Sequence, residues 1–233
     1  METIGNESKA KRFGKAAIDI VSFAALAVII ITIISVPFAT VLLKLGKEEA
    51  DTMSYFILSE TLMLAGVFLS AWIVWHLRGF SLEGLGRSLT MRWKDWLSGI
   101  LLATVLYAVG FGISLWAGAV EIAGVAFNPS SLLISLVFFL LVAVTEELAL
   151  RGFVLERLLQ SGVNKFCALF LSAALFSLIH IGNPNFDFLS FINILLAGIL
   201  LAYIIHSGFI SGYQNRYGDN LKPPTNVYHR MTA

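Results

Sequence analysis

The sequence predicts an all-α fold, a polytopic membrane bundle of about six transmembrane helices. Of its 233 residues, 58% are hydrophobic and 13% are charged, and the mean hydropathy is +0.82. Soluble domains have about 45–50% apolar and about 25% charged residues. Apolar runs near or above bilayer-spanning length recur along the chain: Ala16–Leu43, Tyr55–Leu77, Trp96–Val120, Ser131–Leu159, Phe166–Ile181 and Phe188–His206.

The N-terminal half of the chain contains three of these runs. Residues 1–15 are polar, and we expect a cytoplasmic N-terminal arm there. The first run is too long for the apolar part of a signal peptide, about 7–15 residues, so we expect it to remain as an anchor. Within the transmembrane region 16–130, Asp19 is expected to be solvated at the inner boundary. Glu60 is a lone acid without a basic neighbour and receives no role.

The orientation follows from the basic residues in the connections. Lysines and arginines gather before the first run, between the second and third runs, and around the turn between the fourth and fifth runs. The other connections are acidic or lack basic residues. Because cytoplasmic connections carry the excess of Lys and Arg, we expect a multi-pass protein of the cell membrane with both termini in the cytoplasm.

Two carboxylates and a guanidinium lie at the end of the fourth apolar run. Glu146, Glu147 and Arg151 follow the uncharged stretch Ser131–Val144. Ionisable groups at membrane depth are costly unless paired or solvated, and they mark functional sites. On a helix, Glu147 and Arg151 are i,i+4 neighbours that can pair, whereas Glu146 projects about 100° away. The pattern predicts one acid held in an ion pair and one acid left free.

His180 ends the fifth apolar run and is predicted to face Glu146. If the segment 161–164 reverses the chain between two antiparallel helices, Glu146 and His180 are each about 17 residues from Val163. This corresponds to about 25 Å along either helix, at roughly 1.5 Å per residue. A free acid, an imidazole and a paired acid then share one buried layer.

The segments after His180 carry weaker signals. Asn193 lies in the sixth run, where a buried amide either bonds between helices or orients a catalytic residue. Residues 208–233 are polar, and no seventh apolar run follows. The single cysteine, Cys167, excludes an intramolecular disulfide and is expected to be an ordinary apolar helix residue.

The motif Glu146-Glu147-x-x-x-Arg151, followed by Phe176-x-x-x-His180, resembles the CAAX protease and bacteriocin-processing (CPBP, or abortive-infection) family of intramembrane proteases. The resemblance covers about residues 131–207, taken here as the core. It implies an intramembrane endopeptidase in which Glu146 is the general base acting on a water. His180 would position that water or stabilise the oxyanion, and Glu147 and Arg151 would form a supporting pair. The family has been described both as glutamate-dependent and as metalloproteases, so the resemblance implies either no cofactor or a divalent metal such as zinc.

One part of the family pattern has no counterpart. The family continues with an apolar helix bearing His-x-x-x-Asn or His-x-x-x-Asp, but His206 is followed by Ile210 and His229 by Ala233. The tail 208–233 is therefore interpreted as truncated or altered relative to the family.

Two further function classes follow from the same residues. A catalytically inactive binding or immunity-type membrane protein on this scaffold is the main alternative, because of the missing motif. A proton-coupled transporter would also place acids, arginine and histidine in its spans, but it predicts an internal repeat that the sequence lacks. The expected partners are the lipid bilayer and a peptide or membrane-anchored protein substrate. There is no basic stripe or phosphate loop, so nucleic acid is not expected.

Overall fold

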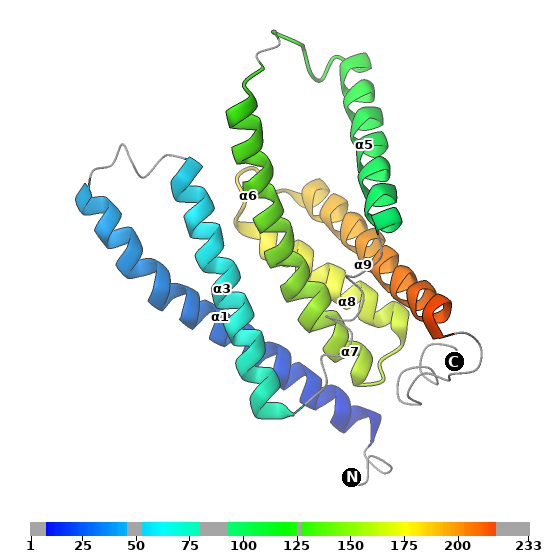
Figure 1. Ribbon diagram of the computed structural model, residues 1–233. Helices are drawn as coiled ribbons and strands as arrows, with labels where there is room; N and C mark the ends of the chain where they lie inside the picture. Colours follow the sequence, from blue (N-terminus) through cyan, green and yellow to red (C-terminus); the bar gives the residue numbers. More distant parts are fainter. Residues whose placement is uncertain (1–7, 46–52, 80–92, 125–126, 218–233) are drawn as a thin grey trace.

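The computed structural model describes residues 8–45, 53–79, 93–124 and 127–217, and throughout these ranges the regular elements are helices (Figure 1). This confirms the all-α prediction. Five stretches are long and apolar enough to cross a membrane, and the described apolar part of the last helix, Phe188–Tyr203, is shorter. The elements in order are α1 (Lys9–Leu45), α3 (Met53–Arg78), α5 (Trp93–Trp116), α6 (Pro129–Glu147), the π-helix η2 (Leu148–Leu155), α7 (Glu156–Gln160), α8 (Lys165–Leu178), the 3₁₀ turn η3 (Ile179–Gly182) and α9 (Phe188–Tyr217).

Both ends of the chain are more helical than the sequence suggested. Helix α1 begins at Lys9, so the expected N-terminal arm already belongs to the first helix from that residue onward. Helix α9 continues to Tyr217, ten residues into the segment taken as a polar tail. In both places the helix extends beyond the apolar run, so hydropathy did not mark the helix boundary.

The fourth apolar run forms α6, η2 and α7 in direct succession. Asn128 caps α6, since its side chain accepts hydrogen bonds from the backbone N–H groups of Ser130 and Ser131, and Pro129 occupies the first turn. Directly after Glu147 the hydrogen-bond register widens into the π-helix, which contains Arg151. Such π segments occur frequently at functional sites.

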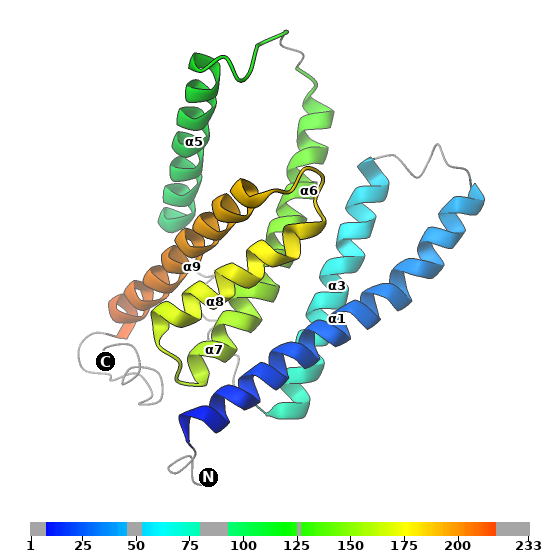
Figure 2. The same ribbon diagram turned by 180° about the vertical axis from the view of Figure 1, so that it is seen from behind.

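The turn between α7 and α8 reverses the chain as predicted. Gly162 has a φ of +83°, a left-handed conformation that glycine adopts without strain. Asn164 then caps α8 by accepting a hydrogen bond from the N–H of Phe166. These residues bring α8 back alongside α7 and η2, which is the arrangement that the symmetry about Val163 requires (Figure 2).

The packing leaves the helices in unequal environments. Helix α9 packs closely on α8, and α1 pairs with α3, which in turn contacts α6. Gly198 permits the first of these contacts, because a Cβ atom there would lie 3.1 Å from the Cβ of Ala173. In contrast, the span Gly99–Trp116 of α5 has no buried residues within the described chain, and its helix stands apart from α1 and α3 in both views (Figures 1 and 2).

Asp19 is not solvated, contrary to the prediction. Its side chain is 2% exposed and forms ion pairs with Arg78, at 2.5 Å, and with Arg157. The three residues come from α1, α3 and α7. Because hydropathy shows only that Asp19 is near a span end, the two arginines that enclose it could not be read from the sequence.

Candidate active site

Glu147 and Arg151 form the predicted ion pair. Arg151 Nη1 lies 3.1 Å from Glu147 Oε1, and the Arg151 side chain is only 4% exposed. Its Nη2 donates a 3.4 Å hydrogen bond to the carbonyl of Gly198 on α9. The guanidinium also lies 4.4 Å from the centre of the Phe176 ring on α8, a distance at which a cation is attracted to an aromatic face. Arg151 thus ties the end of α6 and the π-helix to both α8 and α9.

His180 lies in the 3₁₀ turn that ends α8, with its ring held on one side. Its Nδ1 lies 2.7 Å from the carbonyl oxygen of Phe176, and its ring packs edge-on against the Phe176 ring at 4.8 Å. Because a carbonyl can only accept, Nδ1 carries the donated hydrogen. In the neutral imidazole Nε2 is then left as an acceptor.

The structure brings His180 and Glu146 together. His180 Nε2 lies 3.5 Å from Glu146 Oε1, so the predicted meeting of these two residues is confirmed, although their roles stay predictions. A carboxylate oxygen and an imidazole lone pair are both acceptors, and 3.5 Å exceeds an ordinary hydrogen-bond length. A water that donates one hydrogen to each would keep its own lone pairs free, which is the state a nucleophilic water requires.

Glu146 and His180 are partly exposed, whereas Arg151 is buried. The side chains of Glu146 and His180 are 30% and 18% exposed, compared with 4% for Arg151. Arg151 is covered by Phe176 and Gly198. The two acids differ in the way the sequence predicted, with Glu147 held by Arg151 and Glu146 turned toward His180.

Glu60 is a third carboxylate near these residues, and neither sequence motif includes it. It is 7% exposed and lies near enough to Glu146 for the two carboxylates to repel each other. Its position on α3, far from both motifs in the chain, explains why no motif revealed it. The available signal was its acidic side chain within an apolar run.

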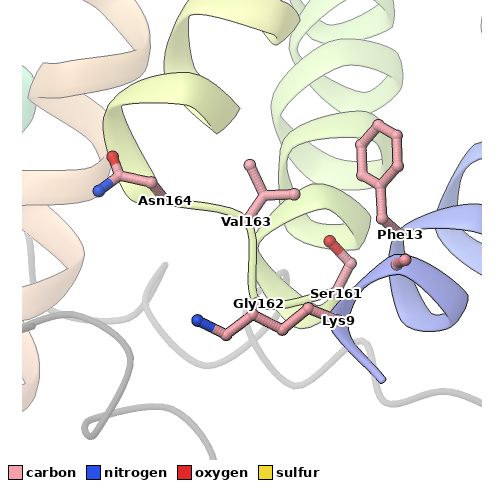
Figure 3. A pocket seen from close by; sticks show the side chains of 7 residues that line it. Lys9, Phe13, Ser161, Gly162, Val163 and Asn164 are labelled. Atoms are coloured by element: carbon pink, nitrogen blue, oxygen red, sulfur yellow. The ribbon is translucent and has the colours of Figure 1, made fainter. Parts of the chain in front are cut away.

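Other polar residues of interest lie outside the site. Asn193 is exposed on α9, so the expectation of a buried amide is wrong. His76 is also exposed, and it stacks on Trp72. An open pocket of about 390 Å³ lies between the start of α1 and the α7–α8 turn (Figure 3), where Lys9, Phe13 and Asn164 contribute to its lining. None of Glu146, Glu147, Arg151 or His180 lines it.

The acids and imidazole do not fit a metal site. Among the described residues, no three His, Cys, Asp or Glu side chains are arranged to hold a metal ion, whereas a catalytic zinc takes three protein ligands. Glu147 is already committed to Arg151.

Comparison with known proteins supports the motif interpretation. Residues 128–208 match the family model Rce1-like, described as type II CAAX prenyl endopeptidase Rce1-like. The match covers α6 through the first part of α9, including Glu146 and His180. No curated protein and no solved structure matches the chain. The chain is a multi-pass membrane protein, and its residues 128–208 are similar to the CAAX prenyl endopeptidase family that the two motifs indicated.

Proposed function

We propose that this protein is an intramembrane endopeptidase that hydrolyses a peptide bond of a membrane-associated substrate with a water activated by Glu146. The observation that carries the proposal is the 3.5 Å approach of His180 Nε2 to Glu146 Oε1. Since His180 Nδ1 donates to Phe176, both groups offer acceptors to one water. The Rce1-like match over residues 128–208 supports a protease-type enzyme in general.

The proposed reaction uses Glu146, His180, one water and the substrate. Glu146 accepts a proton from the water as the water oxygen bonds to the scissile carbonyl carbon. The tetrahedral intermediate then collapses, and the bond to the amide nitrogen breaks as Glu146 returns the proton to that nitrogen. His180 orients the water, and Arg151 holds Glu147 away from it. A carboxylic acid and an amine are the products.

The substrate is a peptide or a membrane-anchored protein in the cell membrane, and both termini of the enzyme lie in the cytoplasm. The basic connections support this orientation. The protein is 58% hydrophobic. A hydrophobic substrate suits such an enzyme, because the substrate can reach the site from within the bilayer and does not have to leave the bilayer.

Removal of the proposed base is the direct test. Membranes containing the wild type, Glu146→Gln or Glu156→Gln would be incubated with a peptide library, and new termini counted by mass spectrometry. Loss of a general base lowers the rate by about 10²- to 10⁴-fold, so Glu146→Gln should lose cleavage while accumulating normally. Glu156 is bonded to Gln160 outside the site, so Glu156→Gln should cleave like the wild type. Unchanged cleavage by Glu146→Gln would exclude the assigned base, whereas no cleavage by the wild type would favour the inactive binding or immunity-type alternative.

A further inference from the structure

Three residues around Glu146 carry buried polar atoms that lack hydrogen-bond partners among the described residues. They are Glu60 (Oε1), Glu147 (Oε2) and Arg151 (Nε and Nη1), of which Nη1 contacts Glu147 only as an ion pair. Native proteins pair nearly all buried polar groups, and an unpaired one calls for an explanation such as a water, an ion or a catalytic role. Glu60 needs that explanation most, because no ion pair includes it in the described chain.

The position of Glu60 relative to Glu146 follows from helix register. Helices α3 and α6 run in the same direction (Figure 1), and they are in contact at Phe56 and Phe138, whose ring centres are 6.3 Å apart. Glu60 is one turn beyond Phe56, and Glu146 is about two turns beyond Phe138. Glu60 therefore lies about one turn, or roughly 6 Å along the axes, before Glu146.

An axial offset of about one turn places the two carboxylates at neighbouring levels of packed helices, where one water can reach both. Two O–H···O bonds of about 2.7–2.8 Å each join oxygens that are between 5 and 6 Å apart, as an order-of-magnitude span. Two carboxylates repel, as these do, and a water that donates one hydrogen to each offsets that repulsion. Buried waters typically have two to four polar partners, which the carboxylates supply.

We propose that Glu60 is a positioning residue, which holds a buried water against one oxygen of Glu146 and so keeps the other oxygen turned toward His180. The inference rests on the proposed function. Glu60 does not touch the substrate, because its free oxygen is buried inside the protein. It acts through Glu146, and in a bundle surrounded by lipid it also keeps water beside the base.

If the Glu60 carboxylate is kept for function, it lowers the stability of the folded protein. Glu60→Met replaces the side chain with an apolar one of similar length and removes a buried oxygen that has no protein donor among the described residues, which is neutral or stabilising for the fold. The same change should misplace the base, and misplacement of about 1 Å lowers rates by up to about 10²-fold. Glu60→Gln keeps an acceptor oxygen and should lie between Glu60→Met and the wild type.

The experiment measures kcat, KM and the melting temperature of purified wild type, Glu60→Met, Glu60→Gln and Ser70→Ala in one detergent. Ser70 is the matched control, because it is fully buried on the same helix but bonds to the Gly66 carbonyl. We expect Glu60→Met to lower kcat about 10- to 100-fold, with KM within about twofold of the wild type and an unchanged or higher melting temperature. Ser70→Ala should keep the wild-type kcat.

Two results overturn the inference. A lower melting temperature for Glu60→Met would show that Glu60 stabilises the fold, whatever the activity. Wild-type kcat in Glu60→Met, alongside an inactive Glu146→Gln, would remove Glu60 from the reaction while leaving the proposed function intact. Full activity in Glu146→Gln would instead reject the proposed function, and the melting temperatures would still decide whether Glu60 is kept at the expense of stability.

Discussion

Arg151 shows how one side chain can support a site without taking part in its chemistry. It pairs with Glu147, donates to Gly198 and stacks on Phe176. The backbone carbonyl of Phe176 in turn accepts a hydrogen bond from His180 Nδ1, and the two side-chain rings pack edge-on. The positions of His180 and Glu147 are therefore coupled through Arg151 and Phe176, so a change at Arg151 reaches the face where the reaction occurs.

Arg151→Ala should lower the yield of folded protein and its melting temperature. The change leaves Glu147 without its partner, and breaking a buried ion pair from one side costs about 3–5 kcal/mol. Since the Glu147 side chain is 35% exposed, solvent reduces the penalty toward the lower end of that range. Thermal unfolding in detergent measures it. Arg151→Lys keeps a charge but not the planar fork, and should fall between Arg151→Ala and the wild type. Normal yield with full activity in Arg151→Ala would contradict the pairing.

The residue-level prediction succeeded where the geometry was local. The pair of Glu147 and Arg151 follows from helical spacing alone, and Glu146 with His180 follows from a short turn between two helices. Glu60 and Asp19 could not be placed in this way. Their partners lie on helices distant in sequence, and only the packing of α3 on α6, or of α1 on α3 and α7, reveals them.

At the scale of elements, the contact between α8 and α9 supports the site from behind. Gly198 on α9 lies against Ala173 and Phe176 on α8, and a Cβ atom there would meet the Phe176 ring at 3.2 Å. The carbonyl of the same glycine accepts from Arg151. A small residue is required because the two backbones approach closely, as is common between membrane helices.

Gly198→Leu should therefore destabilise the bundle and reduce cleavage together. Overpacking costs about 1–3 kcal/mol, and the displaced Phe176 ring would carry His180 away from Glu146. Gly110→Leu on α5 is the matched control, because nothing lies within 4 Å of a Cβ atom there. Melting temperature and cleavage rate should fall only for Gly198→Leu. Equal melting temperatures and cleavage rates for the two variants would show that the close approach of α8 and α9 at Gly198 affects neither stability nor cleavage.

The helices were predictable as elements, but their internal register was not. Apolar runs located every membrane-spanning stretch, yet the π-helix Leu148–Leu155 interrupts what reads as one continuous helix. Likewise, His180 lies in a 3₁₀ turn, while the apolar run continues past it. The π-helix and the 3₁₀ turn each change which backbone N–H and C=O groups form hydrogen bonds with each other. Hydropathy does not predict this hydrogen-bond pattern.

At the scale of the whole molecule, two helix groups meet around the site. Asp19 joins α1, α3 and α7 through Arg78 and Arg157, and Phe23 of α1 stacks on Phe153 of the π-helix at 4.2 Å. The N-terminal helices, which carry no family motif, thus brace the segment that follows Glu146 and Glu147. Glu60 also lies on one of them, α3, outside the 128–208 segment matched by the family model.

Glu146 and His180 are proposed to act on one water, and a double-mutant cycle measures whether they do so. The kcat/KM of the wild type, Glu146→Gln, His180→Gln and the double variant would be measured on one peptide, with His76→Gln as the exposed-histidine control. Residues that act as a unit are not additive, so the double variant should lose no more than about what Glu146→Gln loses alone. Additive losses in kcat/KM would show that the two residues act independently, and would contradict a shared water.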